Sequence, residues 1–150
     1  MNLTKEQQIK NLILTLIQYT TLLAFLLLTP YMAIGIGWQI MELSGILLGI
    51  WAIWVMKESK MHIMPKPRTG AKLIRKGPYR IIRHPMYVAI ILSLTPLIIT
   101  HFDWIRFWIL FVLYINLIFK LTFEETLLVD YFEDYDVYRK TTWKLIPYFF

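Results

Sequence analysis

The chain has 150 residues, of which 57% are hydrophobic and only 17% charged, against about a quarter charged in an ordinary soluble domain. One domain of this length could not bury so much apolar surface in water, so lipid is the expected solvent; the absence of cysteine excludes disulfides, thiolate metal sites and cysteine nucleophiles. The formal charge of +6 would suit nucleic acid, but the positions of the charges favour a different explanation.

Four apolar segments predict an all-α integral membrane protein with four transmembrane helices. No charged residue occurs from Asn11 to Met41, and Pro30, Gly35 and Gly37 divide this run into two helices joined by a tight turn. The predicted spans are residues 11–29, 37–56, 86–102 and 104–123. Each is close to the roughly 20 residues that cross a hydrocarbon core of about 30 Å. We therefore expect a single membrane domain over residues 1–150.

The loop between the second and third predicted spans carries most of the basic residues. These are Lys57, Lys60, Lys66, Arg68, Lys72, Arg75, Lys76, Arg80 and Arg83. The turn between the first two spans has no Lys or Arg, and the turn between the last two has only Arg106 at its edge. Because positively charged loops stay inside, the pattern predicts a multi-pass protein with both termini in the cytoplasm. A prokaryotic cell membrane is the expected location. Membrane lipids are expected partners, and nucleic acid is not, because no stacking platform or recognition helix accompanies the charges.

The segment after the fourth predicted span, residues 124–138, has the spacing of an amphipathic helix. Its apolar and aromatic positions are Leu127 or Leu128, Tyr131, Tyr135 and Tyr138, with acidic residues between them. Two interpretations remain open. The helix could lie at the membrane interface with its tyrosines among the headgroups. Alternatively, its acidic face could turn toward the basic loop, so that the tail folds back over residues 66–83.

The stretch Gly77-Pro-Tyr-Arg-Ile-Ile-Arg-His-Pro-Met-Tyr87 is the densest in residues that can carry chemistry. Pro85 suits the first turn of a helix, where its missing N–H costs nothing. Arg83 and His84 then lie just before that helix, where free N–H groups and the helix dipole attract an anionic group. The alternative is that Arg80 and Arg83 only reach out to lipid phosphates.

Two adjacent carboxylates, Glu124 and Glu125, stand at the end of the fourth predicted span, one turn after Lys120. Ionisable residues at membrane depth are costly, and a helix C-terminus prefers cations, so a positive group should compensate these carboxylates. Arg83, Lys120 or a cationic ligand are the candidates. The alternative is an internal ion pair with the basic loop.

Two other features of the sequence give only weak evidence of function. His62, His84 and His101 lack the spacing of metal ligands, so no metal site is expected. Gly45 and Gly49 put two small residues on one face of the second span, which favours close helix packing over a binding loop.

Taken in order, these motifs resemble the isoprenylcysteine carboxyl methyltransferase and phospholipid methyltransferase superfamily of membrane enzymes. The matching pieces are Gly77-Pro-Tyr79, Arg83-His-Pro-Met-Tyr87, Glu124-Glu-x-x-Leu128, the aromatic run to Tyr135 and Tyr138, and Ile146-Pro147. Each piece is weak alone, whereas the ordered set is specific. The resemblance covers the motif region, residues 60–150.

The resemblance implies a site for S-adenosylmethionine built by the cytoplasmic loop, the ends of the third and fourth spans and the amphipathic tail helix. The implied cofactor-binding residues are Ala71, Lys72, Leu73, Ile74, Tyr79, His84, Pro85, Met86, Tyr87 and Glu124. Lys120 lies where the isoprenylcysteine enzymes place a substrate-contacting arginine, so it is the implied substrate-binding residue. The chain departs from the family pattern in two places. Lys120 carries a point charge where arginine would offer a bidentate guanidinium. Tyr131-Phe132 stands where the family usually has Phe-Gly.

The expected function is methyl transfer from S-adenosylmethionine to a lipophilic or lipid-anchored acceptor, an isoprenylcysteine-like carboxylate or a related small lipid. An amine acceptor would make the chain a phospholipid N-methyltransferase. Such an acceptor must be neutral before attack, and Glu125 is the nearest base; Arg83 completes the predicted catalytic pair. The rival functions are a non-catalytic membrane scaffold, a lipid-binding protein, and a reductase with a nicotinamide cofactor. The sequence leaves the oligomeric state open.

Overall fold

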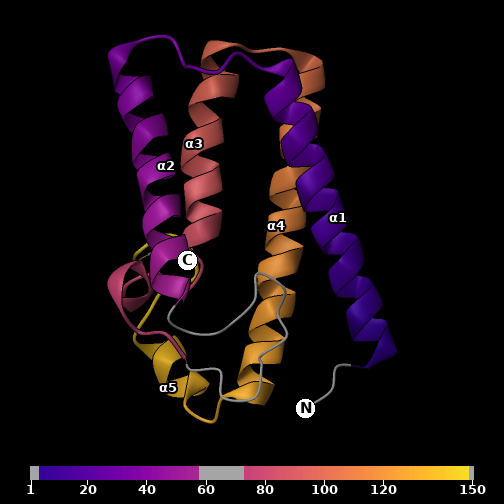
Figure 1. Cartoon of the computed structure of the whole chain (residues 1–150), viewed down its shortest axis with the longest axis vertical. Coiled ribbons are helices and arrows are strands. Elements are labelled where there is room, and N and C mark those ends of the chain that lie inside the picture. Colours follow the sequence, from indigo (N-terminus) through magenta and orange to yellow (C-terminus); the bar gives the residue numbers. More distant parts are fainter. Residues whose placement is uncertain (1–3, 58–72, 149–150) are drawn as a thin grey trace.

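The structure, a computed structural model, describes residues 4–57 and 73–148. This part of the chain is helical and contains no β-strand. Its elements are α1 (Lys5–Leu28), α2 (Ile36–Met56), the short 3₁₀ helix η2 (Gly77–Arg80), α3 (Pro85–Thr100), α4 (Trp104–Tyr131) and α5 (Tyr135–Lys140) (Figure 1). The prediction of an all-α fold is confirmed. Ala71 and Lys72, predicted to bind the cofactor, lie outside the described residues.

Helix α1 begins at Lys5, well before the predicted Asn11. The reason is a capping box at Thr4. The Thr4 hydroxyl accepts a hydrogen bond from the Gln7 N–H at 3.2 Å, and the Gln7 side chain accepts one from the Thr4 N–H at 2.9 Å. These local bonds begin the helix among polar residues, so the start of the apolar run does not mark the start of the helix.

Helix α4 continues to Tyr131, and the prediction of a separate tail helix starting at Glu124 is wrong. No glycine or proline interrupts residues 104–131, so nothing in the backbone stops the helix at the predicted end of the span. The Phe132 N–H still bonds to the Leu128 carbonyl at 3.0 Å. What remains of the tail helix is α5, with six residues.

The four long helices pack as two pairs, α2 against α3 and α1 against α4, and the pairs contact each other less (Figure 1). Gly45 lets the first pair approach closely. A Cβ atom at this position would lie 2.6 Å from the Ser93 backbone nitrogen and 2.9 Å from the Ala89 carbonyl oxygen, so any larger residue would push the helices apart. The prediction that Gly45 serves helix packing is confirmed.

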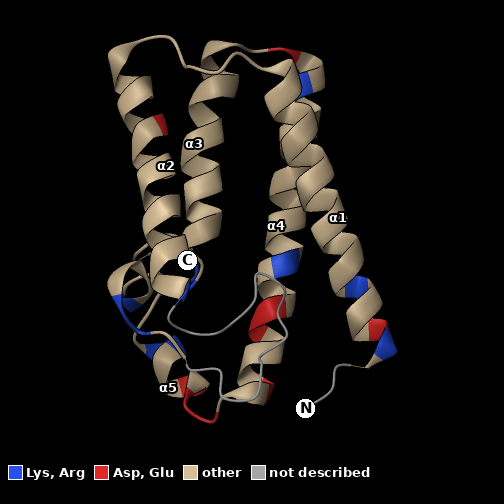
Figure 2. Cartoon of the chain, viewed as in Figure 1, with Lys and Arg blue, Asp and Glu red and all other residues tan. Residues whose placement is uncertain are grey.

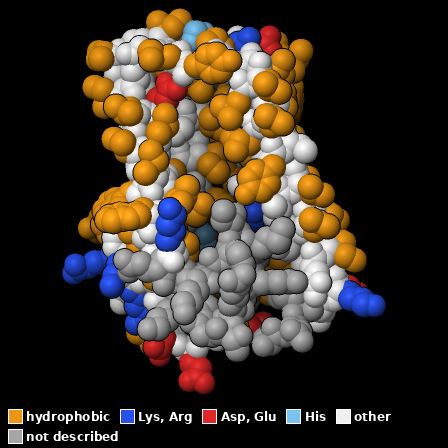
Figure 3. Space-filling model, viewed as in Figure 1, with side chains coloured by type: hydrophobic (Ala, Val, Ile, Leu, Met, Phe, Trp, Pro, Cys, Tyr) orange, Lys and Arg blue, Asp and Glu red, His pale blue; other side chains and the backbone are white. Residues whose placement is uncertain are grey.

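The distribution of side chains fits a membrane protein. Among the described residues, α1, α2 and α4 are long and apolar enough to cross a membrane, and α3 is a shorter apolar helix. Charged side chains gather at the end of the bundle that carries α5 and the start of α1 (Figure 2). Hydrophobic side chains cover the helices toward the opposite end (Figure 3).

The end of the bundle opposite α5 is held by carboxylates that accept backbone N–H groups. Glu42 on α2 is buried and accepts from the Ala33 N–H at 3.0 Å, which fixes the turn between α1 and α2. Asp103 caps α4, accepting from the N–H groups of Ile105 and Arg106 at 2.9 and 3.3 Å.

Candidate active site

A cavity of about 480 Å³ lies between the two helix pairs. Its size falls in the range of roughly 300–1,000 Å³ that is usual for small-molecule sites. Helices α1 and α2 supply mostly apolar wall, including Leu22, Leu26 and Ile46. The polar groups of the wall come chiefly from residues 79–87 and from α4, so the cavity has a polar end beside an apolar stretch.

The tail folds back onto the segment that precedes α3. The Arg83 and His84 N–H groups bond to the carbonyls of Trp143 and Lys144 at 2.8 and 3.2 Å, and the Trp143 N–H bonds to the Ile81 carbonyl at 3.1 Å. These bonds give the segment a fixed backbone partner. Of the two interpretations of the tail, folding back is therefore confirmed over the described part of the loop, residues 73–83.

Tyr135 and Tyr138 of the tail are buried, so the placement of these two tyrosines among headgroups is wrong. Tyr135 is 1% exposed and Tyr138 is 4% exposed. Burial raises the pKa of the Tyr138 hydroxyl to about 12, so at neutral pH it stays protonated. It donates to the Tyr79 carbonyl at 2.6 Å, which fixes η2 against the tail. The acidic face does turn to the loop, where Asp134 and Arg75 form an ion pair at 3.5 Å.

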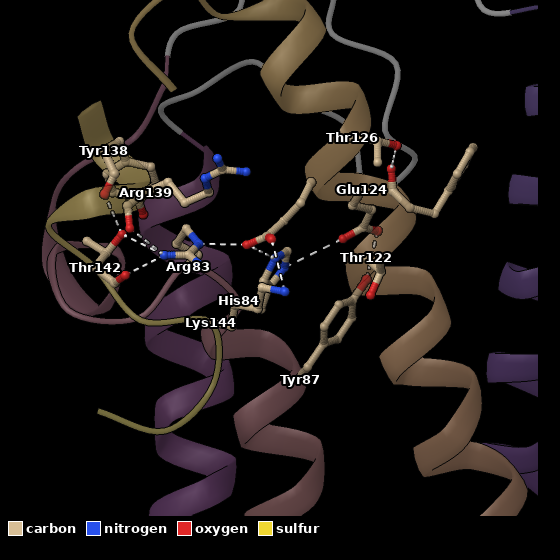
Figure 4. Close-up of polar contacts among 12 residues, drawn as sticks. Arg83, His84, Tyr87, Thr122, Glu124, Thr126, Tyr138, Arg139, Thr142 and Lys144 are labelled. Atoms are coloured by element: carbon tan, nitrogen blue, oxygen red, sulfur yellow. Dashed lines mark hydrogen bonds and ion pairs between the residues drawn. The ribbon is translucent and has the colours of Figure 1, made fainter. Parts of the chain in front are cut away.

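Arg83 and Glu125 form a buried ion pair. The Arg83 Nε donates to Glu125 at 2.6 Å, and Arg83 also donates to the carbonyls of Arg139 and Thr142 (Figure 4). Lys144 lies 3.5 Å from the same carboxylate. The structure thus shows the internal ion pair that was the alternative interpretation for this carboxylate. Glu125 is not among the residues that line the cavity.

Glu124, one residue earlier, faces the cavity. Its carboxylate accepts a hydrogen bond from the Tyr87 hydroxyl at 2.7 Å and lies 3.7 Å from His84 Nδ1 (Figure 4). The rings of His84 and Tyr87 stack with centroids 5.4 Å apart. The Glu124 side chain is 16% exposed, twice the 8% of Glu125. Neighbouring residues on one helix therefore have different surroundings: Glu124 is open to a ligand, and Glu125 is enclosed by protein cations.

Tyr79 presents an unsatisfied hydroxyl beside the cavity. It lines the wall, and its buried hydroxyl has no hydrogen-bond partner among the described residues. Burial, with the nearby Tyr138 and Glu124, raises the pKa of the Tyr79 hydroxyl, so it remains a donor. A buried polar group without a partner is costly, and a ligand atom could supply the missing bond.

The start of α3 offers fewer free donors than predicted. Pro85 has no N–H, and the N–H groups of Tyr87 and Val88 both bond to the His84 carbonyl, at 3.0 and 3.2 Å. The tail carbonyls occupy the N–H groups just before the helix. An anionic group at this position would therefore find fewer free N–H donors than a helix N-terminus normally provides.

Lys120 is almost fully buried and belongs to the cavity wall. It is 2% exposed, and its Nζ donates to the Gln18 side-chain oxygen on α1 at 2.7 Å. Sequence reasoning overlooked Gln18 and the whole contribution of α1 to the wall. The signal was present: Asn11, Thr15 and Gln18 recur at helical spacing on an otherwise apolar helix, and polar residues at membrane depth face the protein interior.

The predicted site residues that the structure brings together on the cavity wall are Tyr79, Arg83, His84, Pro85, Met86, Tyr87, Lys120 and Glu124. Leu73 and Ile74 are described but do not line the cavity. Ile74 instead packs against Ala52, Val55 and Tyr79. Among residues 4–57 and 73–148 there is no group of three or more side chains that could hold a metal ion.

A family model described as phospholipid methyltransferase matches residues 32–135. The chain belongs to the phospholipid methyltransferase family. Membership, together with the long apolar helices, indicates a membrane methyltransferase. The match covers α2, η2, α3 and α4, so it begins earlier and ends earlier than the motif region predicted from the sequence. No curated protein and no solved structure matches the chain.

Proposed function

We propose that this membrane methyltransferase transfers a methyl group from S-adenosylmethionine to a lipophilic acceptor that enters the cavity from the bilayer. The observation that carries the proposal is the placement of Glu124. Its carboxylate faces a cavity of suitable size, is held by the Tyr87 hydroxyl, and lacks the cationic partners that enclose Glu125. A cationic ligand would supply the missing compensation.

The residues at the polar end of the cavity fit this cofactor. S-adenosylmethionine supplies a methyl group bound to a positively charged sulfur. Glu124 provides an acceptor for an ammonium or for ribose hydroxyls, and the unpartnered hydroxyl of Tyr79 provides a donor. The rings of Tyr79 and Tyr87 provide aromatic faces that attract a sulfonium through cation–π interaction.

Arg83 and Glu125 are better suited to positioning than to proton transfer. Glu125 is bonded to Arg83 at 2.6 Å and lies off the cavity wall, so it is poorly placed to take a proton from an acceptor. The pair joins α4, the start of α3 and the tail. It therefore holds His84, Tyr87 and Glu124 in register, and alignment is the main requirement of an in-line methyl transfer.

Two acceptor classes fit the cavity. The description of the matched family favours a phospholipid, and hence N-methylation of an amino headgroup. The position of Lys120, where the isoprenylcysteine enzymes carry a substrate-contacting arginine, favours a prenyl-thioether carboxylate. Both have a long apolar part that suits the wall formed by Leu22 and Leu26. Identification of the labelled product decides between them.

We also propose that all four long helices span the bilayer, with both termini in the cytoplasm. The charged end of the bundle carries η2, α5 and the start of α1 (Figure 2). Because the chain has no cysteine, single cysteines can test this topology. A cysteine at Tyr31, which is 92% exposed, should label from outside intact cells, and one at the exposed Lys140 only after permeabilisation. The reverse pattern would contradict the proposed orientation.

The direct test of function uses purified protein in nanodiscs with methyl-tritiated S-adenosylmethionine and a total lipid extract. We expect label in a lipid product, and micromolar binding of S-adenosylhomocysteine by calorimetry. A non-catalytic scaffold or lipid-binding protein would give neither result. A reductase would instead bind a nicotinamide cofactor, which the same calorimetry can detect.

A further inference from the structure

Helices α1 and α4 meet along a polar seam. Asn11, Thr15 and Gln18 are buried on α1, and Asn116 and Lys120 are buried on α4. The Asn116 side chain donates to a backbone carbonyl of α1 at 3.0 Å, so part of the seam ties the two helices together. Of these five residues, Gln18 and Lys120 line the cavity. Burying polar residues at membrane depth costs free energy, and such residues are commonly functional, so we expect Gln18 and Lys120 to have a role beyond packing.

Lys120 forms no ion pair within the described residues. Its ammonium carries three donors, and the one hydrogen bond that it makes goes to the neutral side chain of Gln18. Glu124, one helical turn away, acts on Lys120 only at a distance, because its carboxylate is hydrogen-bonded to the Tyr87 hydroxyl and makes no ion pair with the ammonium. A buried cation without a counter-charge in direct contact is unfavourable. An anionic atom in the cavity would remove this penalty.

Gln18 supplies a second donor at the same place. Its side-chain oxygen accepts from Lys120, and its amide nitrogen has no hydrogen-bond partner within residues 4–57 and 73–148. An amide N–H and an ammonium side by side suit a phosphate or a carboxylate, which presents several acceptor sites. Leu22 and Leu26 follow Gln18 on the cavity wall at one and two turns, a distance of about 12 Å along the helix.

We infer that Gln18 and Lys120 form a subsite for an anionic oxygen group of the acceptor, whose apolar chain runs along Leu22 and Leu26. In this subsite Gln18 determines specificity, because a neutral amide leaves the Lys120 charge available to the ligand. The inference rests on the proposed function and names the chemistry of its acceptor. Helix α1 lies outside residues 32–135, so the subsite draws on a part of the chain that the family match does not cover.

The test measures binding without turnover. The full chain in phosphatidylcholine nanodiscs is titrated with decyl phosphate, decanoate and decanol, with empty nanodiscs as the reference for partition into lipid. We expect at least one of the two anions to bind at least about tenfold more tightly than the alcohol. Preference for the phosphate points to a phospholipid acceptor, and preference for the carboxylate to an acidic one. Equal binding of all three ligands would overturn the subsite.

Substitutions test whether the preference for anions arises at Gln18 and Lys120. Gln18→Glu places a carboxylate against the Lys120 ammonium and should abolish the preference for anions, as should Lys120→Met. Asn116→Ala weakens the same seam away from the cavity wall and should leave the preference unchanged. A wild-type preference in both Gln18→Glu and Lys120→Met would overturn the inference. S-adenosylhomocysteine binding is measured in parallel. Wild-type affinity in the variants shows that they are folded and that Lys120 does not serve the cofactor, whereas loss of this affinity in a folded Lys120→Met variant would overturn the inference. Absence of binding in the wild type refutes the proposed function while the anion preference remains measurable.

Discussion

The molecule holds two buried cations in contrasting surroundings. At the start of α3, Arg83 is bonded to the Glu125 carboxylate and to two backbone carbonyls of the tail, so its charge is matched inside the protein. On α4, Lys120 has the side chain of Gln18 as its one hydrogen-bond partner and no ion pair within the described residues. Both side chains line the same cavity.

This difference separates structural charges from charges that await a ligand. A cation whose partners are all protein atoms holds elements together, and removing one partner mainly affects stability. A cation on a cavity wall that has no contacting carboxylate is available to a ligand, and removing it mainly affects binding. The same distinction divides the adjacent carboxylates, with Glu125 in the first class and Glu124 in the second. The variants below test this division.

The largest effect, a loss of stability, is expected from Glu125→Gln. The substitution leaves the buried Arg83 guanidinium without its carboxylate, which should lower the free energy of unfolding by about 3–5 kcal/mol. The measurement is reversible unfolding in mixed micelles. The matched control is Asp134→Asn, which breaks an exposed ion pair with Arg75 and should change stability by no more than about 1 kcal/mol.

A double variant sharpens this result. Removing both charges with Arg83→Met and Glu125→Leu avoids an unpaired buried ion, so the double variant should be more stable than Glu125→Gln alone. Losses that simply add up would show that the two residues act independently, contrary to the ion pair in the structure.

The sequence identified the cavity residues that lie in the contiguous motif before and within α3. Residues 79–87 are close in the chain, so a turn and a helix start suffice to bring them together. The surroundings of Glu124 and Glu125 could not be assigned in the same way. The partners that enclose Glu125 come from Arg83 and from Lys144 in the folded-back tail, and no local pattern encodes that contact.

The next effect concerns cofactor binding. Glu124→Gln removes the cavity-facing charge, and a hydrogen bond to a charged group contributes about 1.5–3 kcal/mol, so affinity for S-adenosylhomocysteine should fall roughly 10- to 150-fold. Calorimetry in nanodiscs measures this. Asp136→Asn is the matched control, because it makes the same charge change at a side chain that is 60% exposed. Equal affinities in the two variants would place Glu124 in the structural class.

The contribution of α1 was missed for a different physical reason. The apolar pattern that marks a membrane span dominates this helix, and three polar residues change it little. Their importance appears only when α4 is packed beside them, because Gln18 meets Lys120 across 102 positions of sequence. Such a contact depends on tertiary packing, although the helical spacing of the polar residues could have suggested a buried face.

A smaller effect is expected at the end of the bundle opposite α5. Asp103→Ala removes the N-cap of α4 and should reduce stability by about 0.5–2 kcal/mol. Because Asp103 lies far from the cavity wall along α4, affinity for S-adenosylhomocysteine should stay at the wild-type value. This variant shows whether a modest loss of stability alone weakens binding. A matching fall in affinity would mean that the effect of Glu124→Gln cannot be assigned to the lost charge.

The smallest effect is expected from Tyr87→Phe, which removes the hydroxyl that donates to Glu124 and keeps the ring that stacks on His84. A typical hydrogen bond contributes about 0.5–1.5 kcal/mol, so loss of the bond that orients the carboxylate should weaken S-adenosylhomocysteine binding by roughly 2- to 13-fold. The unfolding free energy should change less than in Glu125→Gln, because this substitution leaves no buried charge without its ion-pair partner. The hydroxyl could instead compete with the cofactor for the carboxylate, in which case the variant would bind more tightly than wild type. A rise in affinity would therefore refute an orienting role for Tyr87 and leave Glu124 as the ligand-facing charge.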